Sequence, residues 1–352
     1  MRDVILSISV LFLLSLSVVI LNSIDKTLFP GYFGFIILAV VFFWFFSQID
    51  FDIVSVFSNH FYIISILLLV LTLIIGRVTR GTVRWIPLGP FNLQPGEVVR
   101  PLLLVFFANY LTNGRLTAKK MWKVLALAVL PIFLILIQPS LGVSIVTSVG
   151  ILGVVLASSF NKKYILMAFG IAIVLLPIFW RVIAPYQRQR LMTFMNPTSD
   201  PLGTGYNSLQ STIASGDGQI LGRGLGEGIQ TQLSFLPEKQ TDFIFASVAE
   251  ELGFLGATGM LVATFIILYR LVVYTENAAN PAARAYLSGF FLTYLLQVFV
   301  HVGMDMGLLP VTGLPFPLVS AGGSSLLATM IGLGIALGAY KNKKLATRIG
   351  TW

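Results

Sequence analysis

Three carboxylates lie close together in a segment that is otherwise long and apolar. Asp242, Glu250 and Glu251 occur in TDFIFASVAEELGFLGATGMLVATFIILY, residues 241–269. A charged side chain near the middle of a membrane-spanning helix costs roughly 2.5 to 3.5 kcal/mol on insertion scales. Acids in such a segment are therefore candidates for proton transfer or ligand binding before any other feature of the chain is considered.

The three acids cannot share one role, because they do not share one face of a helix. At 100° per residue, Glu250 lies about 80° and Glu251 about 180° around the axis from Asp242. Asp242 stands at the start of the segment, where it is placed either to cap the helix beginning at Phe243 or to act as a general base. For Glu250 and Glu251 we favour packing against other helices near the small residues of GFLGATG, with a polar path through the membrane as the alternative.

A fourth acid is accompanied by a cation. Glu97 and Arg100 are three residues apart in LQPGEVVR, so they lie close in angle at the head of one helix. An ion pair is the least costly way to keep both groups in a membrane. The cation is also placed to orient a second carboxylate such as Asp242.

Proline and glycine interrupt the apolar pattern at three places: GTVRWIPLGPFNLQPGE, IQPSLG and MGLLPVTGLPFPLVSAGGSS. These residues rule out regular helix. Irregular backbone at membrane depth is tolerated where it lines a cavity, so we predict that the three segments wall one outward-facing pocket. They supply the polar candidates for substrate binding: Trp85, Gln94, Gln138 and Ser324. The last lies in a GGSS sequence whose N–H groups could meet a phosphate.

The composition is that of a polytopic membrane protein. Of the 352 residues, 56% are hydrophobic and only 11% are charged, and the mean hydropathy is +0.89. Apolar runs recur along nearly the whole chain, and no hydrophilic stretch is long enough to fold alone. We therefore predict a single all-α transmembrane domain over residues 1–352.

The residue types that are scarce exclude several kinds of site. The chain has no cysteine, which removes disulfides, thiolate nucleophiles and zinc–thiolate sites, and its two histidines, His60 and His301, are too far apart for a histidine metal cluster. The net charge of +9 does not indicate nucleic-acid binding, because the basic residues lie in short loops between apolar runs. We predict no nucleic-acid partner.

Apolar windows of about 17 to 25 residues have the length of membrane-spanning helices. About ten such windows can be drawn, at residues 4–22, 31–47, 59–76, 97–112, 122–138, 141–159, 164–185, 242–273, 284–307 and 317–340. The polar stretch 186–241 is then a large extracytoplasmic loop between the seventh and eighth spans. An even number of spans places both termini on one side of the membrane.

The distribution of basic residues favours cytoplasmic termini. With that orientation 13 of the 23 Lys and Arg residues face inward, 9 face outward, and Arg100 lies in the fourth span. The outward ones concentrate in 76–96 and 181–241, on the side of Asp242, where they suit an anionic substrate such as a phosphate-bearing lipid headgroup. Contact with ordinary phospholipid headgroups is the alternative. We nominate three of these cations for substrate binding: Arg84, Arg190 and Lys239.

Taken together, these motifs make the chain resemble the SEDS family (shape, elongation, division and sporulation), and most closely its RodA branch. The resemblance covers nearly the whole chain. It is carried by RWIPLG, LQPGE, QPSLG, FMNPTSDPLGTGYNSLQS, GRGLGEGIQTQLSFLPEKQTDFIFASVAEELGFLG and GLLPVTGLPFPLVSAGGSSLL. The long central motif is the most specific of them.

The resemblance implies a ten-span enzyme that polymerises lipid II into glycan strands of peptidoglycan outside the cytoplasmic membrane, for cell elongation and shape. It implies a class B penicillin-binding protein as partner, beside lipid II, the growing glycan strand and membrane lipids. The family's essential aspartate matches Asp242, and its supporting acid and cation match Glu97 and Arg100. No cofactor is firmly implied, although a divalent cation such as Mg²⁺ or Mn²⁺ would serve beside the arginines to hold pyrophosphate.

The implied reaction is an inverting glycosyl transfer. The 4-hydroxyl of a terminal GlcNAc attacks the anomeric carbon of MurNAc, and undecaprenyl pyrophosphate leaves. Asp242 is the expected general base, since partial burial would raise its pKa toward useful basicity while a nearby cation would oppose that shift. A single carboxylate without a second one placed opposite fits transfer better than hydrolysis.

Five positions depart from the common family pattern: Gly96 replaces serine, Arg100 lysine, Ser140 aspartate, His301 asparagine and Ala321 tyrosine. Arginine keeps the charge of lysine but not its geometry or its tunable pKa. These departures leave two other hypotheses open. One is a lipid II flippase that uses Asp242 as a gate or proton site, and the other is a noncatalytic scaffold that docks a penicillin-binding protein through residues 188–241.

Overall fold

The computed structural model describes residues 3–29, 31–79, 82–88, 91–114, 117–158, 170, 181, 185–196 and 204–349. Helices occupy nine of the ten predicted ranges, and the remaining one, 164–185, falls almost wholly outside the described residues. The prediction of an all-α polytopic membrane protein is confirmed. The number of ten spans stays a prediction, because seven of the described helices are long and apolar enough to cross a membrane by length and composition.

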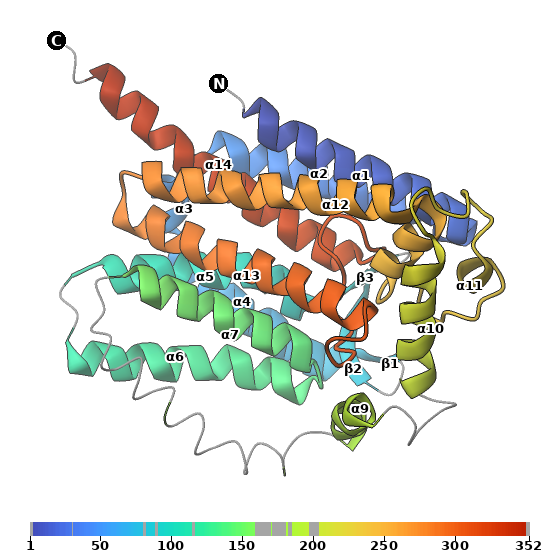
Figure 1. Ribbon diagram of the computed structural model, residues 1–352. Helices are drawn as coiled ribbons and strands as arrows, with labels where there is room; N and C mark the ends of the chain where they lie inside the picture. The colour runs from blue at the N-terminus through green and yellow to red at the C-terminus, as the bar shows by residue number, and fades with distance from the viewer. Residues whose placement is uncertain are drawn as a thin grey trace.

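Long helices form the body of the molecule (Figure 1): α1 (Val4–Ile24), α2 (Gly31–Gln48), α4 (Ser58–Ile75), α5 (Pro95–Thr112), α6 (Ala118–Ile137), α7 (Leu141–Ala157), α12 (Ile244–Asn277), α13 (Pro281–Asp305) and α14 (Gly323–Ile349). The shorter ones are η1 (Lys26–Leu28), α3 (Phe51–Val56), α9 (Pro185–Met195), α10 (Thr204–Asp217) and α11 (Ile229–Gln232). Helix α13 packs against α5, α7 and α12, and α14 packs against α2.

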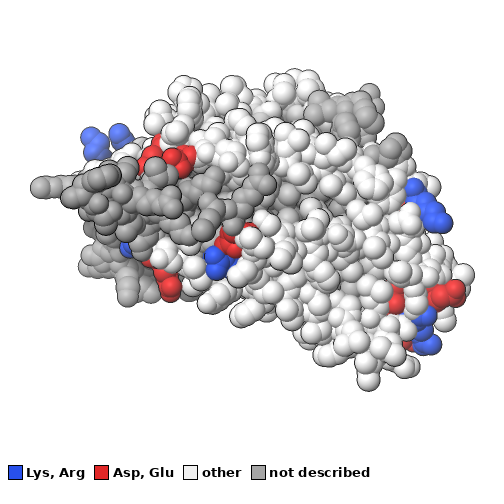
Figure 2. Space-filling view, turned by 90° about the horizontal axis from the view of Figure 1, so that it is seen from above, with Lys and Arg blue, Asp and Glu red and all other residues white. Residues whose placement is uncertain are grey.

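The outer surface of the bundle is apolar. Leu11 on α1, Ile37 on α2, Ile74 on α4 and Phe265 on α12 are each more than 60% exposed. Figure 2 shows a face on which most described side chains are uncharged and the charged ones lie mainly toward its two ends. So large an apolar surface would be a liability in water, and it is the expected contact surface for lipid.

A small antiparallel sheet follows α4, where we had expected irregular backbone. It consists of β1 (Arg77–Thr79), β2 (Thr82–Leu88) and β3 (Phe91–Leu93), in the order β1-β2-β3. The sequence TVRWIPL of β2 is rich in β-branched and aromatic residues, which favour strands. We had interpreted the proline in this sequence only as a helix breaker, and so we did not predict the strand. The sheet, α9, α10 and α11 all lie at the end of the bundle opposite the two termini (Figure 1).

Helix α12 is broken at Gly253, whose φ of 68° and ψ of −165° are not helical. The segment 219–224 pairs with this break. The N–H of Phe254 donates to the carbonyl of Gln219 at 2.8 Å, and the N–H of Arg223 donates to the carbonyl of Glu250 at 2.9 Å. The long polar segment that precedes α12 therefore folds back onto the first turns of this helix.

Replacing Gly253 with alanine should destabilise this docking. A Cβ added there would lie 2.2 Å from the Gly222 nitrogen and 2.5 Å from the Ile220 carbonyl oxygen, both of them backbone atoms, and the positive φ would be strained. We expect a loss of about 1 to 3 kcal/mol in unfolding free energy, measured as a lower melting temperature in detergent. The control is Gly216→Ala, since a Cβ at Gly216 meets nothing within 4 Å. Equal melting temperatures would contradict the docking.

Candidate active site

A cavity of about 510 Å³ lies at the end of the bundle that carries the sheet. Its walls come from β2, the start of α5, the turn between α6 and α7, α9, the segment before α12 and the segment before α14. All three segments that we singled out for proline and glycine contribute to these walls. Non-helical backbone therefore lines a cavity here, the setting in which membrane proteins tolerate it, although the first of the three segments is a β-sheet.

Asp242 lines this cavity from the turn that precedes α12. Two hydrogen bonds fix the backbone just before Asp242: the Ser320 hydroxyl donates to the carbonyl of Thr241 at 2.8 Å, and the N–H of Ala321 donates to the carbonyl of Gln240 at 2.9 Å. The N-cap of α12 is Phe243, so the alternative role of Asp242 as the cap is not realised. Within the part of the chain described, the Asp242 carboxylate accepts no hydrogen bond and stays available to a ligand.

Arg190 lies close to Asp242 across the cavity. Its Nη1 donates to the carbonyl of Val311 at 3.2 Å, and its guanidinium carbon is 5.7 Å from the centroid of the Tyr186 ring. A Cβ added at Gly313 would lie 3.6 Å from both Arg190 Nη1 and Asp242 Oδ2. A single small group of a ligand beside Gly313 would therefore contact the carboxylate and the cation together.

Burial and the neighbouring charges set the pKa of the Asp242 carboxyl. Asp242 precedes α12, and burial raises the pKa of its carboxyl above the ordinary value of 3.8. Arg190, and after it His301 and Arg84, oppose this rise in pKa without cancelling it, whereas Glu238 adds to it. Asp242 is thus a stronger base than an ordinary aspartate, held beside cations that suit an anionic ligand.

Arg84, Trp85, Gln94 and Glu97 also line the cavity, as their sequence positions had suggested. Gln94 is held firmly, since its side-chain Nε2 donates to the Ser140 hydroxyl at 3.1 Å. The Nε of Arg84 is buried and has no hydrogen-bond partner among the described residues. An unpartnered guanidinium nitrogen at the wall of a cavity is suited to bind a ligand oxygen.

Glu97 and Arg100 do not make the expected close ion pair, although their charges still interact. Arg100 instead donates from Nη1 to Oε1 of Gln297 on α13 at 2.6 Å. Gln297 in turn donates to the carbonyl of Pro315 at 2.8 Å and to the hydroxyl of Ser325 at 3.0 Å. Arg100 therefore supports the segment before α14 through Gln297 and does not line the cavity of Asp242.

Three further candidates lie behind the cavity walls. Gln138 is 1% exposed and donates to the carbonyl of Leu69 at 2.9 Å. The hydroxyl of Ser324 accepts the N–H of Gln94 at 2.7 Å, and the ammonium of Lys239 donates to the carbonyl of Thr231. In this structure each of them holds backbone in place, and none is in the lining set around Asp242.

Glu250 and Glu251 are fully buried, and they bind the folded-back segment. Glu250 accepts the N–H groups of Gln230 at 2.7 Å and Thr231 at 3.0 Å, and Glu251 accepts from Nε2 of Gln232 at 2.9 Å. These contacts replace the helix packing near the following glycines that we had favoured. Both acids have a structural use that needs no polar path through the membrane.

Sequence reasoning did not single out Glu238 and Tyr186, which also line the cavity. Glu238 lies four residues before Asp242 in PEKQTD, so an acid so close to the main candidate was a usable signal. Tyr186 is a single aromatic residue at the start of the polar segment, and no sequence pattern distinguished it. Its hydroxyl donates to the carbonyl of Pro139 at 2.5 Å, which joins α9 to the opposite wall.

Comparisons with known proteins agree with this site and fold. Residues 2–345 match the FtsW, RodA and SpoVE family model, described as cell cycle protein. The chain is 36% identical over 318 residues to the peptidoglycan glycosyltransferase MrdB of Escherichia coli K12, covering 90% of this chain and 85% of that protein. It is also 36% identical over 312 residues to the probable peptidoglycan glycosyltransferase FtsW of Aeromonas salmonicida, covering 86% and 78%.

Solved structures give the same answer. A chain from a peptidoglycan synthase complex, in a study of how polymerization and crosslinking are coordinated, matches with a TM-score of 0.81 and 29% identity, covering 96% of this chain and 97% of that one. The rod shape determining protein RodA of Thermus thermophilus matches with a TM-score of 0.72 and 27% identity, covering 96% of each chain. The chain belongs to the SEDS family of FtsW, RodA and SpoVE, in which it is RodA-like.

Proposed function

We propose that this protein is a glycosyltransferase that polymerises lipid II into glycan strands of peptidoglycan. The observation that carries the proposal is the Asp242 carboxylate, which lies beside Arg190 in a cavity that is also lined by Arg84, whose Nε has no hydrogen-bond partner among the described residues. The names of the relatives, peptidoglycan glycosyltransferase MrdB and FtsW, support the same reaction class. A role in cell shape and elongation follows from the RodA-like structure.

In the proposed reaction Asp242 takes the proton from the 4-hydroxyl of the acceptor GlcNAc. The freed oxygen forms a bond to the anomeric carbon of MurNAc, and the bond from that carbon to the pyrophosphate oxygen breaks. Negative charge grows on the pyrophosphate as it leaves. Arg190 is held in place before the reaction by Val311 and Tyr186, so it would stabilise this charge more in the transition state than in the ground state, and Arg84 would add a second positive charge from the cavity wall.

The membrane orientation belongs to the same proposal. The cavity lies at the end of the bundle opposite the two termini, and the outward basic segments lie beside it. With the termini in the cytoplasm, the cavity opens on the outer face of the cytoplasmic membrane, where polymerisation takes place. A polyprenyl chain would then rest in the bilayer while the headgroup entered the cavity.

A class B penicillin-binding protein is the partner that we propose. The support is the likeness to a chain from a peptidoglycan synthase complex that coordinates polymerization and crosslinking. The chemistry agrees, because a strand polymerised at the outer face must be crosslinked at the same face. Under the scaffold hypothesis we had considered residues 188–241 as the docking surface. Exposed apolar side chains of that segment, Ile220, Leu221 and Leu233, would contact such a partner.

A divalent cation fits this cavity only as part of a complex with substrate. No group of three His, Asp or Glu side chains is spaced to hold a metal ion in the part of the chain that the structure describes. Magnesium is commonly held by one or two carboxylates together with substrate phosphates. Asp242, Glu97 and Glu238 line the cavity and would supply such carboxylates, and the ion would neutralise pyrophosphate charge.

The proposal is tested with purified lipid II and the full-length protein, alone and together with a penicillin-binding partner. Glycan strands are separated by gel electrophoresis, and movement of lipid II across vesicle membranes is measured in parallel. Polymer formation supports the transferase. Transport of lipid II without polymer would favour the flippase, and neither activity under either condition would favour the scaffold.

The dependence of the rate on pH is a further expectation. The base form of Asp242 is the carboxylate, and burial raises the pKa of this group above 3.8. The rate should therefore fall as the pH drops through a value higher than an ordinary aspartate would give, and it should level off above that value. Initial polymerisation rates between about pH 4 and 8 measure this limb. A rate that stays flat down to the ordinary aspartate range would contradict Asp242 as the base.

A further inference from the structure

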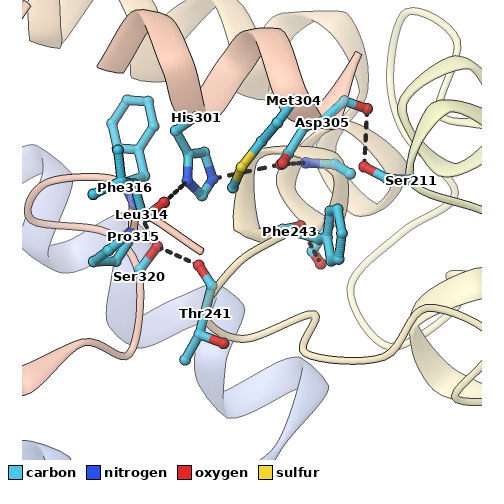
Figure 3. Close-up of polar contacts among 12 residues, drawn as sticks. Ser211, Thr241, Phe243, His301, Met304, Asp305, Leu314, Pro315, Phe316 and Ser320 are labelled. Carbon is cyan, nitrogen blue, oxygen red and sulfur yellow. Dashed lines mark hydrogen bonds and ion pairs between the residues drawn. The ribbon is translucent and has the colours of Figure 1, made fainter. Parts of the chain in front are cut away.

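A buried pair of ionisable side chains lies behind the cavity and has no part in the proposed reaction. His301 and Asp305 are four residues apart on α13, both are 0% exposed, and Nε2 of His301 is 3.4 Å from Oδ2 of Asp305 (Figure 3). Neither residue lines the cavity of Asp242. Burying two such groups away from lipid and water is unfavourable unless their contacts compensate for it.

Asp305 makes contact with the helix that begins immediately after Asp242. Its Oδ2 accepts the N–H of Ala246 at 3.0 Å, in the first turn of α12. The first N–H groups of any helix lack partners within the helix, and a negative charge beside them is stabilising. The N-cap residue Phe243 supplies no side-chain hydrogen bond. Asp305 therefore caps α12 from the neighbouring helix.

His301 joins this cap to another wall of the cavity. Its Nδ1 is 2.7 Å from the carbonyl oxygen of Leu314, which can only accept, so Nδ1 carries a hydrogen and donates it. Nε2 is thereby directed at the carboxylate of Asp305. Leu314 follows Gly313, the position where an added Cβ would touch both Asp242 and Arg190.

We propose that His301 and Asp305 form a positioning pair that sets where Asp242 stands relative to Arg190. Asp305 fixes the start of α12, and His301 fixes the segment 313–314 against it, so the two walls cannot shift independently. One further bond joins the same two walls: the Ser320 hydroxyl donates to the carbonyl of Thr241 at 2.8 Å (Figure 3). The Ser211 hydroxyl of α10 donates to the backbone carbonyl of Asp305 at 2.8 Å and so fixes this end of α13. The kinetic consequence rests on the proposed function.

The test compares Asp305→Ala, Asp305→Asn and His301→Leu with the intact full-length protein. Asparagine keeps an oxygen that accepts the Ala246 N–H, whereas alanine keeps none. We expect Asp305→Ala and His301→Leu to lower kcat by about 10- to 100-fold with KM for lipid II changed by no more than about threefold, since the chemistry depends on placement of the base. Asp305→Asn should recover most of the loss.

A matched control is available at the other end of α13. Asn280 is the N-cap of this helix and accepts the N–H of Ala282 at 2.7 Å, far along the chain from the cavity residues. Asn280→Ala removes a comparable cap, so it should lower the melting temperature in a similar way and leave kcat unchanged. If kcat followed the melting temperature across all four variants, the pair would be merely structural and the proposal would be overturned.

Hydrogen–deuterium exchange gives a readout that needs no enzymatic activity. In Asp305→Ala the amides of residues 244–250 should exchange roughly five- to tenfold faster, because their cap is lost, and Asp305→Asn should restore protection. Unchanged exchange in Asp305→Ala overturns the proposal whatever the kinetics show. If the intact protein makes no polymer, the proposed function fails, and exchange alone decides whether Asp305 positions α12.

Discussion

Replacing Asp242 with asparagine is expected to lower the rate of glycan polymerisation by about 10²- to 10⁴-fold, the range that removal of a general base usually gives. Asparagine has nearly the same shape but cannot accept the proton of the attacking hydroxyl. The fold should be preserved, because the turn around Asp242 is held by backbone contacts, including its own N–H donating to the carbonyl of Glu238 at 3.0 Å. The measurement is initial polymerisation rate from purified lipid II, with lipid II binding measured beside it.

Two companion variants make this result specific. Asp217→Asn removes an acid from the same end of the molecule, where it pairs with the exposed Arg223, and should leave the rate within about twofold of the intact protein. Glu97→Gln removes the second deeply placed acid of the cavity. If Glu97→Gln abolished polymerisation and Asp242→Asn did not, the base would have been assigned to the wrong carboxylate.

The sequence allowed most helices to be predicted because lipid imposes a simple rule on length and polarity. The same rule gave a wrong helix boundary where an apolar segment is not helical. We expected a span from residue 317, yet α14 begins at Gly323. Leu318 has a positive φ of 67°, and Ser320 accepts from Phe316 and donates to Thr241. Hydropathy cannot separate a span from an apolar loop that is held by such contacts.

The candidate site was predictable where residue type alone carried the information. Asp242 and Arg190 stood out as charges beside apolar spans, and both line the cavity. The partners of Arg100, Glu250 and Glu251 could not be found in this way. Arg100 bonds to Gln297, which is 197 residues away, and Glu250 accepts backbone N–H groups that every residue except proline possesses.

The burial of Glu250 and Glu251 also affects the choice between functions. Deep acids on α12 were the main sequence feature that favoured a flippase, because a translocation path needs polar groups through the membrane. Both acids are 0% exposed and accept hydrogen bonds from N–H groups of residues 230–232. The polar groups that remain open to a ligand in the described cavity lie at one end of the bundle, which agrees better with a reaction at one face than with passage through it.

Replacing Arg190 with glutamine is expected to lower kcat by about 10²- to 10³-fold, the usual effect of removing one preorganised group that stabilises transition-state charge. It should also move the acid limb of the pH profile to higher pH. Arg190 is the leading charge that lowers the Asp242 pKa, so its removal lets burial raise that pKa further. One substitution should cause both changes because Arg190 lies near Asp242 and, in the proposed reaction, would also lie near the leaving pyrophosphate.

The pH shift separates this role from general loss of structure, because misfolding lowers the rate equally at every pH. Arg190→Lys keeps the charge and should restore the position of the acid limb, but it should recover only part of kcat, since lysine lacks the two-pronged geometry of arginine. Arg223→Gln is the control: Arg223 is exposed and pairs with Asp217 away from the cavity lining, so both rate and pH profile should stay as in the intact protein. If Arg190→Gln lowered kcat without moving the acid limb, Arg190 would act on the pyrophosphate alone and the coupling to Asp242 would be wrong.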